Sequence, residues 1–485
     1  MIDKIVGLAE NLSPVALIGG GGIGKTSIAL TVLHHDRIKR RFGEDRRFIR
    51  CDQFPATPAH FLTRLSTVTG AGVENPDGLA LLYPFLCSKE MIIVLDNAES
   101  ILDPWGTNDP GIYDIVEELS QLKTVCLCIT SRISTAPPGC QTLNIPSLSV
   151  EAACDIFYRI YKHGGRSDLV NSIPRELYSH PYLIVLLVTT AHLNGWDTAQ
   201  LSKEWKSRRG SAFQADCVAA VVEFSLASHM FQILGPDARE LLGVVAFFPR
   251  GVDESNVDRL FPTITNRTHI FNRFRTFSLT YPSEGFITML APFRDYLCPR
   301  DPKSSPLLCL AKEYYFSRLS VDVNPGKPGF EESGWIISED MNVERLLDVF
   351  TSADPDSTDV WDACCHFMEH LYWHRPRVVA LGPKIEWLPD DHPSKPQSLF
   401  GLSRLFTSVG NYAESRRLQV HALELWRKRE RDLDVAETLL SLSETSRQLN
   451  DSQGGMYQAK EAYQIFVRLD SADGQERSKR QLASL

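Results

Sequence analysis

The sequence has no low-complexity tract, no excess of positive charge and no long hydrophobic run. Its net charge of -9 argues against a protein whose main task is to coat nucleic acid. The most apolar stretch, YLIVLLVTTAHL from Tyr182, is shorter than the roughly 18 apolar residues of a membrane span and predicts a core helix instead. No signal peptide is recognisable at the start. We therefore expect a cytoplasmic protein without a membrane partner.

The eleven cysteines do not have the spacing of zinc sites. Cys126 and Cys128 lie in an apolar run, and Cys364 and Cys365 are adjacent, which favours buried reduced thiols. The length of 485 residues predicts roughly three or four domains. Because the helix-like stretch IDKIVGLAENLS follows Met1 directly, we expect an N-terminal truncation.

Residues 17–27 read LIGGGGIGKTS, and this stretch matches the phosphate-binding pattern G-x-x-x-x-G-K-[ST]. An apolar run, PVALIG, precedes the glycines, and a helix-like run follows them. Consecutive backbone N–H groups and the helix N-terminus would bind phosphate oxygens. We expect Lys25 to reach the β- and γ-phosphates and Thr26 to ligate Mg²⁺. A flexible glycine hinge is the weaker alternative. The predicted phosphate-binding residues are Gly19, Gly20, Gly21, Gly22, Ile23, Gly24, Lys25, Thr26 and Ser27.

A second apolar run ends in acidic residues of the kind that a nucleotide site requires for its metal ion. The run from Met91 to Leu95 precedes Asp96, which we expect to coordinate the metal at the carboxyl edge of a parallel sheet. Glu99 follows closely and is the candidate to orient an attacking water. Taken alone, Asp96 could be an ordinary turn residue, but the glycine motif favours the metal role.

Another apolar run, TVCLCITSR, ends in Arg132. An arginine there can sense the γ-phosphate, whereas the alternative is a surface arginine in a loop. The stretches RRFIRC, before Asp52, and QTLNI are further strand candidates. Because these runs alternate with helix-like segments, we predict a parallel three-layer α/β domain.

In this order, the motifs resemble the nucleotide-binding module of the STAND class of P-loop ATPases, of the NB-ARC/NACHT type, which includes many fungal NOD-like receptors of innate immunity. LDNAE and ITSR resemble its Walker B and sensor 1 motifs. The stretch LNIPSLSVEAACDIFYRIYK resembles the exit from the sheet into a small helical domain. SHPYLIVLLVTTA resembles the family's GxP motif, so the resemblance implies that Pro181 packs by the adenine. His180 stands where that motif has glycine.

The following segment resembles a winged helix. DARELLGVVAFFPRGVDESNVDRLF indicates two helices around a turn, FSLTYPSEGFITML indicates a hairpin, and APFRDYL indicates a helix start. The family carries a Met-His-Asp signature here that holds ADP, but Met289 is followed by Leu290 and Ala291. We therefore assign these two residues no nucleotide role. For Arg294 and Asp295 we favour a local ion pair over an inter-domain contact.

Near the C-terminus the sequence repeats at a spacing of 40 residues. The matched pairs are Leu402 with Leu442, Val409 with Leu449, Ala422 with Ala462 and Trp426 with Phe466. Each unit consists of two amphipathic helices and resembles a long tetratricopeptide repeat. An ordinary helical bundle is the alternative. Since such units are stable only when stacked, we expect the array to continue past Leu485.

The predicted order is an α/β domain and a series of helical domains. The expected segments are residues 1–145 (P-loop NTPase), 146–215 (small helical), 216–300 (winged-helix-like), 301–395 (helical connector) and 396–485 (incomplete tetratricopeptide-like repeats).

The resemblance implies an ATP/ADP-binding, Mg²⁺-dependent signalling switch. Nucleotide exchange would drive rearrangement and homo-oligomerisation, and the repeats would bind a protein partner. Lys25, Asp96 and Glu99 would support slow ATP hydrolysis. The alternative is a transcriptional regulator whose winged helix reads DNA. Its support, the basic run from Arg37 to Arg47, suits the end of a helix and a solvated face, so nucleic-acid binding is the weaker prediction. A kinase-like function is not supported, because the sequence shows no acceptor-substrate domain.

Overall fold

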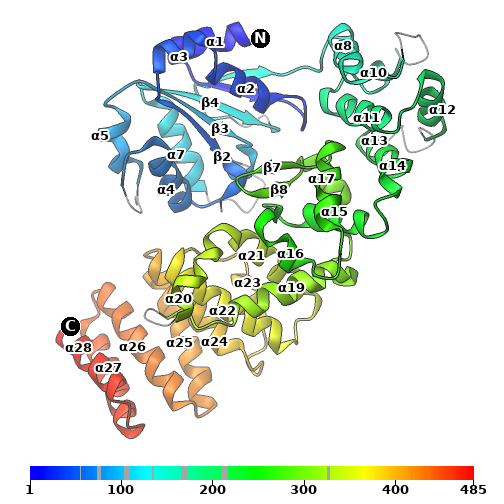
Figure 1. Cartoon of the computed structure of the whole chain (residues 1–485). Helices are drawn as coiled ribbons and strands as arrows, with labels where there is room; N and C mark the ends of the chain where they lie inside the picture. Colours follow the sequence, from blue (N-terminus) through cyan, green and yellow to red (C-terminus); the bar gives the residue numbers. More distant parts are fainter. Residues whose placement is uncertain are drawn as a thin grey trace. The chain divides into compact units, whose positions relative to one another are not determined.

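A computed structural model describes residues 1–54, 56–73, 78–102, 110–133, 136–164, 172–208, 217–324 and 328–484. The chain forms two compact units (Figure 1). The first comprises residues 1–258 and 262–299, and the second comprises residues 259–261 and 300–485. The predicted boundary between residues 215 and 216 lies outside the described residues.

The first unit begins with a five-stranded parallel sheet of strand order β2-β3-β4-β1-β5. All five strands expected from the sequence are present. The run VALI of β1 and the whole of β3 and β4 are buried, as expected for parallel strands covered on both faces. The strands are β1 (Val15–Ile18), β2 (Arg46–Arg50), β3 (Met91–Asp96), β4 (Val125–Ser131) and β5 (Gln141–Asn144).

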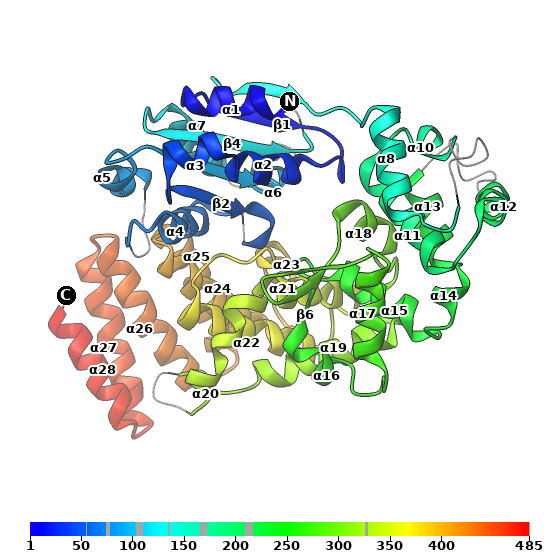
Figure 2. The same cartoon turned by 45° about the horizontal axis from the view of Figure 1, so that its top comes forward.

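Helices cover both faces of the sheet, so the predicted three-layer arrangement is confirmed (Figures 1 and 2). Successive strand residues alternate between two apolar cores, because neighbouring side chains of a strand point to opposite faces. Cys126 and Cys128 are buried in one of these cores. That face carries α1 (Ile2–Glu10), α2 (Lys25–Leu33) and α3 (Asp36–Phe42), and the other carries α4 (Pro58–Thr69), α5 (Tyr83–Leu86), α6 (Glu99–Leu102) and α7 (Pro110–Gln121).

A helical segment follows the sheet. Ser149 caps the N-terminus of its first helix by accepting a hydrogen bond from the backbone N–H of Ala152. The apolar stretch from Tyr182 lies within α11 and supplies buried leucines and valines, as the sequence predicts. No helix in the described part of the chain is both long and apolar enough to cross a membrane. The helices are α8 (Val150–Ile160), α10 (Ile173–Glu176), α11 (Pro181–Leu193), α12 (Thr198–Arg208), α13 (Cys217–Leu226) and α14 (His229–Gln232).

The last part of the first unit combines helices with a small antiparallel sheet of order β6-β8-β7. The hairpin expected around residues 282–285 is formed by β7 and β8. The helix starts expected at DARELL and APFRDYL are also present. The elements are α15 (Asp237–Phe247), β6 (Val252–Asp253), α16 (Val257–Leu260, at the division between the units), α17 (Arg267–Thr276), β7 (Tyr281–Ser283), β8 (Phe286–Thr288) and α18 (Ala291–Leu297).

The second unit is helical, and two of its helices follow the 40-residue spacing noted in the sequence. Helices α25 and α27 begin and end 40 residues apart, as residues 412–428 and 452–468. Their N-caps, Asn411 and Asp451, accept equivalent backbone hydrogen bonds. The helices are α19 (Pro306–Leu319), α20 (Pro328–Glu332), α21 (Ile336–Ala353), α22 (Thr358–His374), α23 (Gly382–Trp387), α24 (Lys395–Ser408), α25 (Tyr412–Lys428), α26 (Asp432–Gln448), α27 (Ser452–Arg468) and α28 (Ala472–Ser484).

Candidate nucleotide site

The candidate site lies at the carboxyl edge of the parallel sheet. Ile18, the last residue of β1, is in register with Ser131 of β4. Arg50, the last residue of β2, is in register with Asp96 of β3. Ligands of parallel α/β sheets bind at this edge. The register therefore aligns the glycine loop that follows β1 with the polar residues that end β2, β3 and β4.

The glycine loop turns sharply into α2. Gly22 has φ +77° and Gly24, the N-cap of α2, has φ +104°, values that favour glycine. The Nζ of Lys25 donates hydrogen bonds to the carbonyls of Gly19 at 2.7 Å and Gly20 at 2.9 Å. Lys25 is only 7% exposed, and burial lowers the pKa of its ammonium group. The loop thus holds a buried cation beside the N-terminus of a helix, which is a suitable site for phosphate.

Gly22 is the glycine of this loop whose replacement has the clearest structural cost. A Cβ there would lie 3.0 Å from Cε1 of His180 and 3.2 Å from Cβ of Tyr182, and the positive φ adds strain. We expect Gly22→Ala to lower the free energy of unfolding by about 1–2 kcal/mol, measured by chemical denaturation. Gly20→Ala is the matched control, because a Cβ at Gly20 meets nothing within 4 Å. Equal destabilisation by both substitutions would contradict this prediction.

The two predicted metal ligands lie together. The hydroxyl of Thr26 donates to Oδ1 of Asp96 at 2.8 Å, and the hydroxyl of Thr130 donates to the same oxygen at 2.6 Å. Asp96 is 2% exposed. Burial raises the pKa of its carboxyl group, while the hydrogen bonds from Thr130 and Thr26 oppose this rise. A hydroxyl and a carboxylate beside a phosphate loop are the oxygen donors that suit Mg²⁺, so these residues fit the predicted metal.

Glu99 and Arg132 contact one another. Nε of Arg132 lies 2.9 Å from Oε1 of Glu99, and the backbone N–H of Arg132 donates to Oε2 at 3.2 Å. Of the two, only Arg132 lines the cavity described below. The predicted roles of Glu99 in orienting water and of Arg132 in sensing phosphate are therefore coupled, because freeing either side chain breaks this ion pair.

Helix α11 reaches the glycine loop through its first residues. Nε2 of His180 donates to the carbonyl of Gly21 at 3.0 Å, and its Nδ1 accepts from the N–H of Leu183 at 3.4 Å. Burial lowers the pKa of this imidazole, in keeping with a neutral ring that both donates and accepts. Pro181 and Tyr182 line the cavity. His180 thus caps α11 and also forms a hydrogen bond to the glycine loop.

These residues surround one cavity of about 580 Å³. Of the predicted nucleotide residues, it is lined by Gly21, Gly22, Gly24, Lys25, Thr26, Ser27, Asp96, Arg132 and Pro181. The predicted residues that are not among its lining are Gly19, Gly20, Ile23 and Glu99. The lining residues that sequence analysis did not assign to the site are Leu30, Phe48, Arg50, Asp52, Asn97, Ser100, Tyr182, Val185, Tyr281, Met289, Leu290 and Arg294.

One of these additions corrects our expectation for the end of the unit. Leu290 lines the cavity, and its lack of a nucleotide role stays a prediction. The expected ion pair between Arg294 and Asp295 is not formed among the described residues; Nη2 of Arg294 donates instead to the hydroxyl of Thr288 at 3.2 Å. Helical spacing explains this result, because adjacent residues of a helix do not face each other.

The hairpin of β7 and β8 contacts the edge of the sheet that carries the site, as Figure 1 shows. Arg50 pairs with Asp52 at 2.9 Å and donates to the hydroxyl of Ser283 in the hairpin. At the tip, Glu284 lies 3.2 Å from Nη2 of Arg64 in α4. Asn97, next to the predicted metal ligand, donates to Asp52 at 3.1 Å. Polar contacts therefore run from the metal end of the cavity to the hairpin.

Comparisons with known proteins give a distant likeness. No protein-family model matches the chain, and no curated protein matches it. One similar crystal structure is a Signal Transduction ATPase with Numerous Domains (STAND) protein with a tetratricopeptide repeat sensor from Pyrococcus horikoshii. It is 12% identical, with 99% of this chain and 79% of that chain covered and a TM-score of 0.43. Another is a Walker-type ATPase of Pyrococcus abyssi, 13% identical, with 61% and 93% covered and a TM-score of 0.31. At this distance, function has to be argued from the chain's own residues.

Proposed function

We propose that this chain is a nucleotide-dependent signalling switch of the STAND class, related to NB-ARC/NACHT proteins such as fungal NOD-like receptors. ADP holds a closed form, and exchange for ATP moves residues 216–300 against residues 1–145. The protein then forms homo-oligomers, and the C-terminal helices bind a protein partner. Hydrolysis is slow and returns the switch to its closed form.

One observation carries this proposal: a single cavity is lined by the glycine loop and also by Tyr281, Met289, Leu290 and Arg294. A nucleotide in that cavity would contact both parts. A ligand shifts an equilibrium between two conformations only when it makes different contacts in each. The shared cavity supplies such contacts, so its geometry supports a switch in which nucleotide identity sets the position of the hairpin and α18.

The residues of the site have separate roles in nucleotide binding and in hydrolysis. The backbone N–H groups of the loop and Lys25 bind phosphates, and Thr26 and Asp96 hold Mg²⁺. When bound, Mg²⁺ would neutralise charge on the phosphate oxygens. Glu99 orients the attacking water once its ion pair with Arg132 opens. The requirement to break that pair favours slow hydrolysis.

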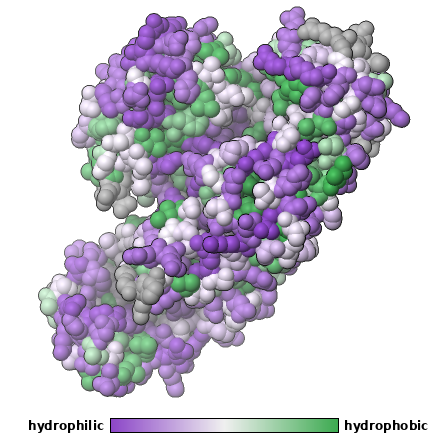
Figure 3. Space-filling model, in the orientation of Figure 1, coloured by the Kyte–Doolittle hydropathy of each residue, from purple (hydrophilic) through white to green (hydrophobic). Residues whose placement is uncertain are grey.

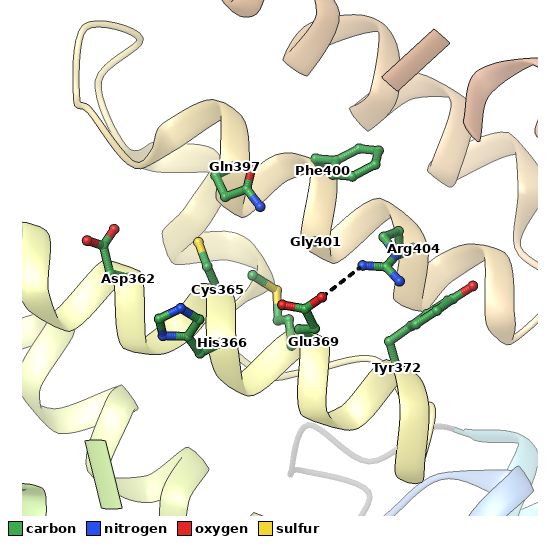
Figure 4. A pocket seen from close by; sticks show the side chains of 10 residues that line it. Asp362, Cys365, His366, Glu369, Tyr372, Gln397, Phe400, Gly401 and Arg404 are labelled. Atoms are coloured by element: carbon green, nitrogen blue, oxygen red, sulfur yellow. Dashed lines mark ion pairs between the residues drawn. The ribbon is translucent and has the colours of Figure 1, made fainter. Parts of the chain in front are cut away.

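The second unit offers a surface for the proposed protein partner. A cavity of about 800 Å³ extends over side chains of α22, α24, α26 and α28. A neighbouring cavity lies between α22 and α24, where Figure 4 shows Glu369 and Arg404 facing each other. The guanidinium of Arg404 lies 3.8 Å from the ring centre of Tyr372. Aromatic side chains and arginine, which both line these hollows, are enriched at protein-binding surfaces.

The switch is tested by the oligomeric state of the protein in its two nucleotide states. We expect light scattering to give a low molar mass with ADP and a severalfold higher mass with Mg²⁺ and a slowly hydrolysed ATP analogue. Lys25→Ala, which removes the phosphate-binding ammonium, should show one mass under both conditions. The same mass for the wild-type protein with either nucleotide would overturn the proposed switch.

DNA binding by residues 216–300 is the weaker alternative. In α17, Arg267 pairs with Asp258 at 2.6 Å and Arg275 pairs with Glu254 at 2.8 Å, while the hairpin contacts the sheet. The basic run near α3 is also compensated, since Arg41 pairs with Glu90 at 3.0 Å. The surface over α1 and α3 is largely hydrophilic in Figure 3, as expected for a solvated face. Retardation of a DNA duplex in a mobility-shift experiment at physiological salt would favour this alternative.

A further inference from the structure

The positive charges that line the cavity differ in how they are compensated. Four cationic side chains contribute to its lining: Lys25, Arg50, Arg132 and Arg294. Arg50 pairs with Asp52 and Arg132 with Glu99, each at 2.9 Å. Arg294 has no carboxylate within ion-pair distance in the described part of the chain. It is thus a guanidinium without an ion-pair partner in the cavity that the glycine loop also lines.

Arg294 is half-buried. Its Nε is buried and has no hydrogen-bond partner among the described residues, and Nη2 donates only to Thr288 at 3.2 Å. Burial lowers the pKa of this guanidinium; Asp52, Tyr281 and Asp295 oppose the shift and the nearby Arg50 adds to it. Asp295 itself is exposed. The guanidinium therefore retains an unused Nε–H donor, and among the described residues no carboxylate forms an ion pair with it at the wall of the cavity.

Taking a charge out of water without a partner is unfavourable. Such a group is consistent with a folded chain when a ligand supplies the opposite charge. The cavity that Arg294 lines also contains Lys25 and the N-terminus of α2, which both favour an anion. Guanidinium groups bind phosphate oxygens with strong, directional hydrogen bonds.

We propose that Arg294 binds the β- or γ-phosphate of the nucleoside polyphosphate that occupies this cavity. The inference rests on the proposed function, because it requires a nucleotide in the cavity. Arg294 belongs to α18, which follows the hairpin directly, whereas the glycine loop begins α2. A polyphosphate held by both therefore ties residues 281–297 to the nucleotide domain.

The test compares affinities for AMP, ADP and a slowly hydrolysed ATP analogue, measured by calorimetry on the full chain. We expect Arg294→Met to weaken binding of ADP and the ATP analogue by about ten- to a hundredfold and to leave AMP binding within about twofold. Arg294→Lys, which keeps the charge, should retain part of the affinity. The control is Arg273→Met, because Arg273 lies on α17 over the ring of Phe277 and outside the cavity lining.

Thermal unfolding without nucleotide separates ligand binding from a structural role. Replacement of a half-buried charge that has no ion-pair partner should leave the apo melting temperature unchanged or raise it, whereas loss of a structural arginine would lower it. A lowered apo melting temperature with unchanged ADP affinity would overturn the inference. The inference would also be overturned if inorganic phosphate stabilised the wild-type protein but not Arg294→Met while the two proteins bound ADP equally well. If the wild-type protein bound no nucleotide, the proposed function would fail and the inference with it; ADP binding that ignores Arg294→Met would remove the inference alone.

Discussion

Lys25→Ala is expected to raise the dissociation constants for ADP and ATP at least about a hundredfold, or about 3 kcal/mol. The ammonium group now donates to two loop carbonyls, at 2.7 and 2.9 Å. Phosphate would take the place of these carbonyls and supply full negative charge instead of partial charge. Charge-assisted hydrogen bonds are stronger than neutral ones, so most of the affinity should depend on this side chain. Fluorescence titration with a labelled ADP measures the change.

The stability of the Lys25→Ala protein should change little. Gly19 and Gly20 are partly or fully exposed, so water can replace the lost donor, and a buried ammonium group is removed. Lys39→Ala is the matched control, because the Lys39 side chain in α3 is 47% exposed and lies 4.0 Å from its partner Asp36. Wild-type affinity for the labelled ADP in the Lys25→Ala protein would show that the glycine loop is not the phosphate site.

The parts of the fold that could be predicted from the sequence depend on contacts close along the chain. Three of the five strands, β1, β3 and β4, are short buried runs that are mainly apolar, and the glycine loop joins a strand to a helix within a few residues. The 40-residue spacing of α25 and α27 could be predicted for a similar reason: residues 40 apart share a local helical environment, and Leu402, Leu442, Ala422 and Ala462 are all buried. Local patterns carry such information without any knowledge of the fold.

The parts of the site that sequence analysis missed depend on pairings between distant segments. Arg50 is a strand residue whose importance follows from its register with Asp96, 46 positions away. His180 forms a hydrogen bond to Gly21 of the loop, although the two residues are 159 positions apart in the sequence. Arg294 seemed paired with its neighbour in sequence, whereas the fold directs it into the cavity. The alternation of side chains along RRFIRC could have indicated where β2 ends. Periodicity alone, however, does not show which distant residue lies beside Arg50.

Asp96→Asn is expected to reduce Mg²⁺-dependent ATP hydrolysis at least about a hundredfold while ADP binding without Mg²⁺ changes little. Asparagine keeps an oxygen that can accept from Thr26 and Thr130, so the local hydrogen bonds at 2.8 and 2.6 Å can persist. It loses the negative charge that a divalent cation requires. Single-turnover release of phosphate from ATP measures hydrolysis, and ADP titration in the presence and absence of Mg²⁺ measures the contribution of the metal.

The pH dependence of the wild type and the thermal stability of the Asp96→Asn protein provide two further measurements. Burial raises the folded-state pKa of Asp96, so its carboxyl becomes protonated at a higher pH than an ordinary aspartate, and Mg²⁺ enhancement in the wild type should fade as pH falls through that value. The same shift means that ionised Asp96 lowers stability at neutral pH. The apo Asp96→Asn protein should therefore melt at the same or a higher temperature. Asp36→Asn, at a side chain 88% exposed, is the control. Undiminished Mg²⁺-dependent hydrolysis in Asp96→Asn would contradict the metal assignment, and a lowered apo melting temperature would contradict the electrostatic account of its burial.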